Sequence, residues 1–432
     1  MQRISSYIKK YRLNVVLILI ILAQLPFMLH WIDARDFWSD ESVTVNFTRI
    51  SHGDNLLQSF KNFRLETTSP PLFYLLASIW IRIIPFDTAV SPSDPFFPRL
   101  ISLIFTVLCM YFCGIVAKKI KGGRAAILST LFAATSWYLI IQAGFQFRAY
   151  GLLVFLSILI LYLYILRIEN PQKTKYKIIY SVFILLTMYT HWFGLVIVGV
   201  LGLLDLCLFL RKKIKWRDML GYLFSGILFL PYFLWVISRR TSRGLGLTFW
   251  IEPPTVQRAL RTIDWITSRS DLIFTLFLAG VVITIVIAVL KYTSSGRSYI
   301  KANRDNKSDI YKSIIVLTDS KKAYYAIVPV AIVCFVFTGI YLYSRFMVPG
   351  SSFFTTRYFV AIVPQLLVVA AIGADWLIDV VFLNKRTQFE QTIIFIVIVC
   401  ILALWLGLNA INHLNLFALG EILPHLGAIR IK

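Results

Sequence analysis

The chain has 432 residues, of which 58% are hydrophobic and only 15% are charged, with a formal net charge of +23. Soluble globular chains carry about 25% charged residues, so this composition excludes a soluble domain and indicates a membrane protein. The positive charge does not indicate a nucleic-acid-binding protein. Lysine and arginine fall mainly in short segments between apolar runs, where such residues orient membrane proteins.

Apolar runs long enough to cross a bilayer predict about eleven transmembrane helices and hence an all-α, polytopic membrane protein. The first run follows a basic amino-terminal segment and is not followed by a small-x-small cleavage site, so we interpret it as a retained span and not as a signal peptide. The expected spans are Leu13–Leu29, Leu100–Val116, Ala125–Ile141, Tyr150–Leu166, Ile178–Tyr189, Gly194–Leu210, Met219–Ile237, Leu272–Leu290, Ala323–Tyr343, Tyr358–Leu383 and Thr392–Ala410.

The stretch Pro70–Pro85 is apolar too, but its 16 residues are fewer than the ~20 that a crossing needs. If it crossed, the basic clusters at 118–121 and 211–213 would move to the outer face, against the positive-inside rule. We therefore predict a juxtamembrane or partly inserted helix on the outer face. The amino terminus and five loops, which carry 27 of the 44 lysine and arginine residues, then share the cytoplasmic side.

The loops divide the chain into predicted parts. Segment 30–99 is a long first outer loop that holds eight of the 21 acidic residues, and long ordered loops are often functional. The polar stretch 291–322 predicts a cytoplasmic linker. It would separate an amino-terminal catalytic transmembrane module, residues 1–290, from a carboxy-terminal transmembrane module, residues 323–432.

Cysteine and histidine give no sign of a metal site. All five cysteines lie in apolar runs and form no CxxC pair, so we expect neither disulfides nor a zinc site. The five histidines are scattered along the chain without the spacing of metal ligands.

Two adjacent acids follow the first predicted span. Asp40 and Glu41 come just after Trp38, near the apolar boundary. Neighbouring carboxylates repel each other, and partial desolvation makes a carboxylate a stronger base, which suits proton removal in catalysis. Trp38 offers a flat surface for a sugar ring or an isoprenoid. The alternative is an interfacial turn with solvated acids and a tryptophan of the aromatic belt.

The double proline Pro70-Pro71 forces an extended entry into the apolar stretch that contains Tyr74. Taken alone, this pattern is more typical of an ordinary helix start.

Two Arg-Tyr motifs lie at predicted outer boundaries: Arg148 with Tyr150, and Arg357 with Tyr358. Arginine presents planar donors that match phosphate oxygens, so the pair of motifs indicates an anionic ligand at the interface. The alternative is snorkelling, with the tyrosines as interface anchors. Weaker candidates, for which we favour a structural role, are Arg239, Arg240, Arg243 and the loop Trp250–Pro254. Asp205, Asp375 and Asp379 are expected to snorkel toward Arg211 or Lys385.

The order of these motifs resembles that of the multispan (GT-C type) glycosyltransferases related to protein O-mannosyltransferases and lipid A aminoarabinose transferases, a family 39-like superfamily. The resemblance covers about residues 36–170. Asp40-Glu41 matches the family's acidic pair, and Pro70-Pro71-Leu72 with Tyr74 matches its His-Pro-Pro-Leu element. Arg148-Ala149-Tyr150 matches its Glu-x-Arg-x-Tyr element. Ser69 and Gln146 stand where the family has histidine and glutamate.

This resemblance implies a multi-pass cell-membrane enzyme with its active site on the outer face. It would transfer a hexose or pentose, with inversion, from a polyprenyl-phosphate carrier to an acceptor glycan, lipid or protein. It implies no nucleotide-sugar and no obligatory metal, and leaves a divalent metal open. The alternatives are a polysaccharide ligase or polymerase with a diphosphate-linked donor, or a lipid or solute transporter. The expected site residues are Asp40 as base, Glu41 to orient acceptor or base, Arg148, Arg357, Tyr150 and Tyr358 for the donor phosphate, and Trp38, Pro70, Pro71 and Tyr74 as lining.

Overall fold

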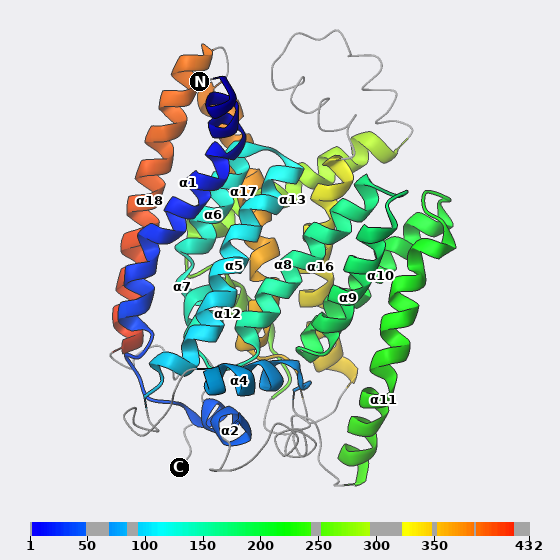
Figure 1. The fold of residues 1–432 in the computed structure, drawn as a ribbon. Coiled ribbons are helices and arrows are strands. Elements are labelled where there is room, and N and C mark those ends of the chain that lie inside the picture. Colours follow the sequence, from blue (N-terminus) through cyan, green and yellow to red (C-terminus); the bar gives the residue numbers. More distant parts are fainter. Residues whose placement is uncertain are drawn as a thin grey trace.

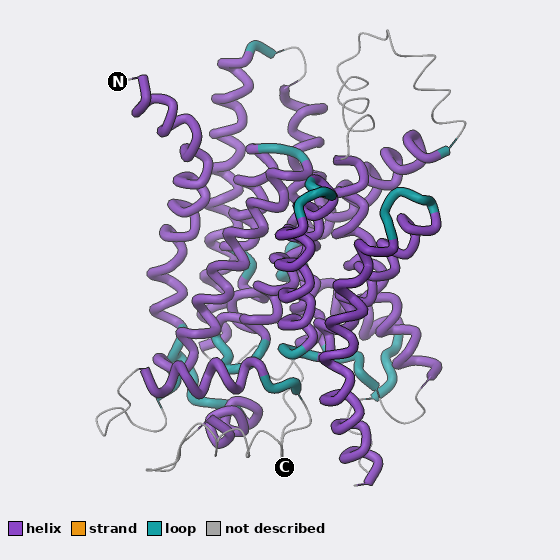
Figure 2. The backbone as a smooth tube through the Cα atoms, turned by 45° about the vertical axis from the view of Figure 1, so that its right-hand side comes forward, coloured by secondary structure: helices purple, strands orange, loops and turns teal. Residues whose placement is uncertain are grey.

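The computed structural model describes residues 2–48, 69–83, 94–242, 252–293, 322–347, 352–383 and 386–418. Within these ranges the chain folds into helices joined by short turns, with no strand (Figure 2). The long helices run side by side as one bundle (Figure 1). They are α1 (Gln2–Trp31), α5 (Phe96–Ile120), α6 (Gly123–Ala134), α8 (Tyr150–Glu169), α9 (Thr174–Met188), α10 (Trp192–Leu210), α11 (Leu220–Ser242), α13 (Asp271–Tyr292), α16 (Lys322–Leu342), α17 (Val363–Ile378) and α18 (Gln388–Ala418).

The all-α polytopic fold is confirmed. In the described ranges, nine helices are long and apolar enough to cross a membrane. A tenth span results if α6 is joined to the helical segment Trp137–Gly144, which begins with the short helix α7 (Trp137–Leu139) and is bent by 55° from α6. The remaining predicted span corresponds to α9, whose 15 residues make it about 22 Å long, shorter than the ~30 Å hydrocarbon core.

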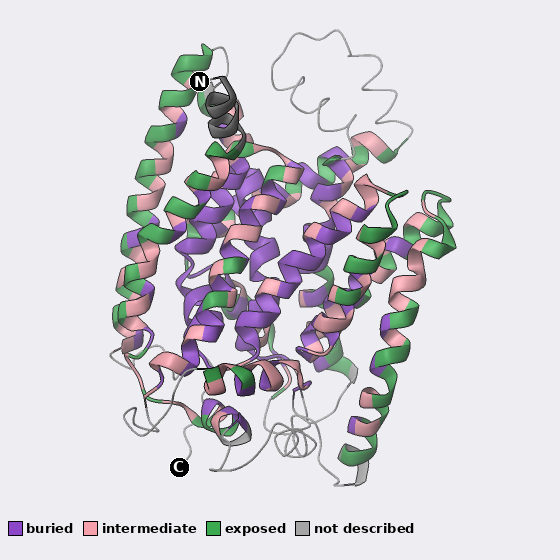
Figure 3. Cartoon of the chain, viewed as in Figure 1, coloured by how far each residue is buried: buried purple, intermediate pink, exposed green. Residues whose placement is uncertain are grey.

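Helix α17 lies at the centre of the bundle (Figure 3). In the most apolar stretch of the span that contains it, 89% of the residues are buried, compared with 17% in α1 and 22% in α18. Glycines allow α13 to approach it closely: a Cβ at Gly280 would lie 2.2 Å from the Val369 carbonyl oxygen, and one at Gly373 would lie 2.2 Å from that of Leu276. α17 also packs against α5, α6 and α16.

The proposed division into modules stays a prediction. Most of the expected linker lies outside the described residues. The helices on its two sides are packed together, since α17 from the carboxy-terminal part contacts α5, α6 and α13 from the amino-terminal part.

Two short helices lie across the bundle at the end opposite the amino terminus (Figure 1). They are α2 (Ser39–Thr48) and α4 (Leu72–Ile83), which contact each other, and α4 also contacts α5. The backbone N–H of Leu72, the first residue after the double proline, donates to the Tyr189 carbonyl at 3.0 Å. The described part of this apolar stretch, residues 70–83, therefore forms a crosswise 12-residue helix and not a further span, as predicted.

The opposite end of the bundle carries the described basic turns and a set of ion pairs. Here the prediction for the aspartates was wrong. Asp205 pairs with Arg167 at 2.5 Å and not with Arg211, and Asp375 pairs with Arg124 at 2.9 Å. Both carboxylates are buried between helices, where a partner from a neighbouring helix lies closer than any residue at the membrane surface. Asp379 pairs with Lys121 and Arg124. Lys385 lies outside the described residues.

Candidate functional site

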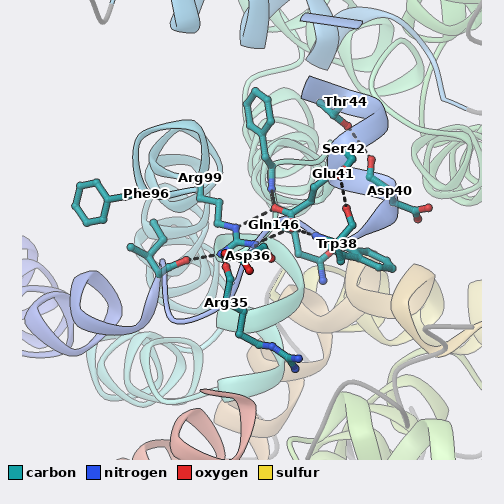
Figure 4. A network of polar contacts seen from close by, with 12 residues as sticks. Arg35, Asp36, Trp38, Asp40, Glu41, Ser42, Thr44, Phe96, Arg99 and Gln146 are labelled. Carbon is teal, nitrogen blue, oxygen red and sulfur yellow. Dashed lines mark hydrogen bonds and ion pairs between the residues drawn. The ribbon is translucent and has the colours of Figure 1, made fainter. Parts of the chain in front are cut away.

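The two adjacent acids at the start of α2 have opposite environments. Side chains of consecutive helical residues point about 100° apart. Figure 4 shows Asp40 and Glu41 pointing away from each other. Glu41 has no exposed surface, whereas 32% of the Asp40 side chain is exposed. Only Asp40 is therefore accessible to a ligand.

Both oxygens of Glu41 are occupied by groups of the protein. Oε1 accepts from the Phe147 backbone N–H at 2.6 Å and from Arg99 Nε at 2.9 Å. Oε2 accepts from Arg99 Nη2 at 2.8 Å and from the Trp38 backbone N–H at 3.3 Å. This bidentate ion pair fixes α2 to α5 and to the turn before α8 (Figure 4). The role expected for Glu41, to orient the acceptor or the base, stays a prediction.

Arg99 makes the same junction rigid from the other side. Its guanidinium also donates to three backbone carbonyls after α1: those of Ile32 and Arg35, each at 2.8 Å, and that of Asp36, at 3.1 Å. Arg99 is 2% exposed, and its charge is balanced by Glu41. The loop that delivers Asp40 is therefore fixed over most of its length.

Asp40 faces two arginines from distant parts of the chain. Its Oδ2 accepts from Arg357 Nη1 at 2.8 Å, and Arg148 Nη2 lies 4.0 Å from the same oxygen. Arg148 Nη1 also donates to the Asp40 backbone carbonyl at 2.9 Å and to Thr44 Oγ1 at 3.3 Å. Both arginines are largely buried. Two guanidinium groups from distant parts of the chain thus meet at one carboxylate.

Aromatic rings surround the arginines. The Arg357 guanidinium lies 5.3 Å from the centre of the Trp38 ring and 5.4 Å from that of Tyr358, distances typical of cation–π contacts. The Tyr150 and Tyr358 rings both pack against His191, with ring centres 5.5 Å and 5.7 Å apart. Within the described part of the chain, the buried Trp38 Nε1 has no hydrogen-bond partner. A polar donor thus lies beside the cation.

The turn that carries Arg357 is held by its own neighbours. The Tyr138 hydroxyl donates to the Thr356 carbonyl at 2.5 Å, and the Thr262 and Thr356 hydroxyls lie 3.2 Å apart. Thr262 belongs to the short helix α12 (Val256–Ile266), and Tyr138 to the bent segment after α6. The bend after α6 thus contributes to the position of the second arginine.

Sequence reasoning missed His191. The histidines were judged only by the spacing of metal ligands, but His191 occupies the N-cap of α10, directly before a span. Its Nδ1 accepts from the Phe193 backbone N–H at 3.2 Å. Burial, together with the charges of Arg148 and Arg357, lowers the pKa of this imidazole to about 3. The available signal was a histidine between two aromatic residues near the end of a predicted span at the same boundary as the Arg-Tyr motifs.

The proline motif lies beside this cluster and supports α4. Pro70 is buried, and Tyr74 is 3% exposed. Phe73 packs edge-on against Phe147 at 5.8 Å between ring centres, next to Arg148 in the chain. A lining role for Pro70, Pro71 and Tyr74 stays a prediction.

The weaker candidates remain apart from the site or cannot be placed. Arg239 is exposed on α11, and the side chain of Arg240 as well as residues 243–251 lie outside the description. In the described ranges no three His, Cys, Asp or Glu residues are grouped to hold a metal ion.

Comparison with known proteins places the fold. No family model and no curated protein matches the chain. Among solved structures, ArnT from Cupriavidus metallidurans bound to undecaprenyl phosphate aligns over 94% of this chain and 75% of its own, with a TM-score of 0.54 and 14% identity. The same protein in its apo state aligns with a TM-score of 0.53 and 13% identity. The Archaeoglobus fulgidus oligosaccharyltransferase, tethered with an acceptor peptide, aligns over 95% of this chain and 56% of its own, with a TM-score of 0.51 and 13% identity. The chain therefore has the GT-C fold that these membrane glycosyltransferases share.

Proposed function

We propose that the chain is a membrane glycosyltransferase that moves a monosaccharide from a polyprenyl-phosphate carrier to an acceptor on the outer face. The observation that carries this proposal is the arrangement of Asp40 between Arg357, at 2.8 Å, and Arg148, at 4.0 Å. This cluster combines a candidate base with a cationic site at the end of an apolar bundle. The similar ArnT structure contains undecaprenyl phosphate, which supports a polyprenyl-phosphate donor.

The two arginines would hold the donor's phosphate. Arginine binds phosphate oxygens through two parallel N–H donors, and such charge-assisted bonds are roughly twice as strong as neutral ones. The phosphate of a membrane lipid lies at the surface of the hydrocarbon core, the depth at which apolar helices end. A carrier could thus place its phosphate at Arg148 and Arg357 while its isoprenoid tail stays along the helices.

Asp40 would take the proton of the acceptor hydroxyl. Oδ2 is paired with Arg357, whereas Oδ1 makes no hydrogen bond within the described ranges. The acceptor oxygen attacks the anomeric carbon, the bond from that carbon to the phosphate oxygen breaks, and the acceptor proton passes to Asp40. Polyprenyl phosphate leaves with its charge stabilised by the arginines. Direct attack inverts the anomeric configuration.

The end of the bundle that carries Asp40, Arg148 and Arg357 is assigned to the outer face from the distribution of charge. The basic clusters at 118–121 and 211–213 belong to the end of the bundle that carries the amino terminus, opposite the site. By the positive-inside rule that end faces the cytoplasm.

The test is a donor panel. Purified full-length protein is incubated with polyprenyl monophosphate and diphosphate sugars and a mixture of acceptors, and release of the lipid carrier is measured with and without a metal chelator. We expect release from a monophosphate donor that Asp40→Asn abolishes. Release from diphosphate donors alone would replace this proposal by the ligase or polymerase, and release from none would reject a transferase.

A further inference from the structure

His191 is a polar group among the aromatic rings of the site, and the proposed transfer reaction gives it no role so far. Its side chain is 5% exposed, and its ring is packed between those of Tyr150 and Tyr358, at 5.5 Å and 5.7 Å. These tyrosines follow the two phosphate-binding arginines in the chain, Tyr358 directly and Tyr150 after one residue. The imidazole thus lies where the two Arg-Tyr motifs converge.

The hydrogen bond at one ring nitrogen fixes the proton on the other. Nδ1 accepts from the Phe193 backbone N–H at 3.2 Å, so Nδ1 carries no proton. In a neutral imidazole one nitrogen donates and the other accepts. Nε2 therefore carries the hydrogen and is a donor.

The surroundings keep the ring neutral. Burial is the main cause of the lowered pKa of His191, and the charges of Arg148 and Arg357 add to it. The other charged group of the cluster, Asp40, is engaged with those arginines. A neutral donor does not repel the guanidinium groups, so it can share a ligand with them, whereas a third cation could not without cost.

We propose that His191 presents Nε2–H to the phosphate of the lipid-linked donor as a neutral third hydrogen-bond donor beside Arg148 and Arg357. This inference rests on the proposed function and names a further binding residue of that site. The imidazole would bind the group that becomes the leaving phosphate and would take no part in proton transfer. Its position at the N-cap of α10 adds the favourable field of a helix amino terminus toward an anion.

Two substitutions separate this role from simple capping. In His191→Asn the side-chain oxygen can replace Nδ1 as acceptor for the Phe193 N–H, but no donor reaches the position of Nε2. In His191→Gln the side-chain amide reaches the Nε2 position and donates there, while the capping bond is lost. The control is His413→Asn, because His413 stacks on Trp137 at 4.5 Å, away from the arginines.

The measurement is the affinity of full-length protein for undecaprenyl phosphate, with undecaprenol as the ligand lacking phosphate, alongside the melting temperature of each variant without ligand. We expect His191→Asn to keep the melting temperature but to bind the phosphate roughly tenfold more weakly, as loss of a hydrogen bond to a charged group predicts. His191→Gln should melt lower but bind within about threefold of wild type, and His413→Asn should bind like wild type.

Wild-type affinity in His191→Asn, or weaker binding only in proportion to lost stability in both variants, would reduce His191 to a cap and overturn the inference. A different result would show that the proposed function itself is wrong. If wild-type protein binds undecaprenol as tightly as undecaprenyl phosphate, no phosphate site exists, and both proposals fall together.

Discussion

Two clusters of arginine and aspartate lie at opposite ends of the bundle and differ in how far their side chains are exposed to solvent. At the far end, Arg167 and Asp205 pair at 2.5 Å with 4% and 0% of their side chains exposed. At the site end, Asp40 is 32% exposed and faces two arginines. The first cluster is closed to solvent, whereas the second has a partly exposed carboxylate that two guanidinium groups face.

The closed cluster is enclosed by tyrosines. The Arg167 guanidinium lies 5.0 Å from the ring of Tyr164 and 4.7 Å from that of Tyr180. Tyr164 pairs through its hydroxyl with Tyr324 at 2.6 Å, and Tyr180 pairs with Tyr222 at 2.7 Å. These residues come from α8, α9, α10, α11 and α16, so the cluster joins five helices. Removing one member of such an enclosed pair would leave the other charge buried without its partner, which is strongly destabilising.

The largest expected effect is on stability at the closed end. Arg167→Ala should lower the free energy of unfolding by about 3–5 kcal/mol, because it leaves the Asp205 charge buried without its partner. Thermal unfolding of the detergent-solubilised protein measures this. The double variant Arg167→Met with Asp205→Leu should recover most of the loss. An Arg167→Ala protein as stable as wild type would remove the contrast between the clusters.

The next effect is on activity at the open end. Asp40→Asn should reduce transfer by roughly 10²-fold or more while the melting temperature stays near that of wild type, since the proposed role of this partly exposed residue is that of a base. Glu41→Gln is the matched variant, and it should affect stability more than activity. It weakens the buried bond to Arg99 and should lower the melting temperature more clearly than it lowers the rate per folded molecule. Full transfer by Asp40→Asn would rule out Asp40 as base.

The third prediction concerns pH. The pKa of His191 in the fold, about 3, is below its ordinary value of 6.5, so the unfolded chain binds a proton that the folded chain does not. Stability from this residue is therefore complete above about pH 6.5 and is lost as pH falls toward 3. At pH 4 the loss relative to pH 7 should be on the order of 2–3 kcal/mol. His191→Asn should flatten this part of the curve, and an unchanged curve would contradict the buried neutral state.

The smallest expected effect separates phosphate binding from snorkelling. Arg148→Lys and Arg357→Lys keep the charge but lose the planar pair of donors, so each should weaken donor binding by roughly tenfold. The alanine variants should weaken it further, and free polyprenyl phosphate should compete poorly with donor in them. Arg217→Lys is a control at the opposite end, where Arg217 is exposed in the short helical turn Trp216–Met219 before α11. If the lysine variants bind donor as tightly as wild type, both arginines only anchor their helices at the membrane surface.

Sequence patterns were sufficient for the bundle and for part of the site. Long apolar runs and basic loops predict the spans, because burial in a bilayer constrains composition at every residue. The Arg-Tyr motifs at one predicted boundary placed Arg148 and Arg357 at the same depth, and the structure brings both to Asp40.

The remaining details depend on packing between helices, which no local pattern specifies. Asp40 and Glu41 are adjacent in sequence, and only the rotation of α2 against α5 decides that Glu41 meets Arg99 while Asp40 stays open. For the same reason Asp205 was assigned to the wrong partner, since Arg167 lies on a different helix. His191 was missed because its neighbours Tyr150 and Tyr358 are distant in the chain.

The central position of α17 has a consequence for biosynthesis. A chain is translated from its amino terminus, so α5, α6, α13 and α16, all of which contact α17, are made before it. The span that contains α17 also carries Arg357, which pairs with Asp40 from the beginning of the chain. Until this late segment enters the bilayer, the earlier helices lack the partner that fills their centre. A chain terminated before residue 356 would have neither a closed core nor a complete cationic site, so such a product would not be expected to act.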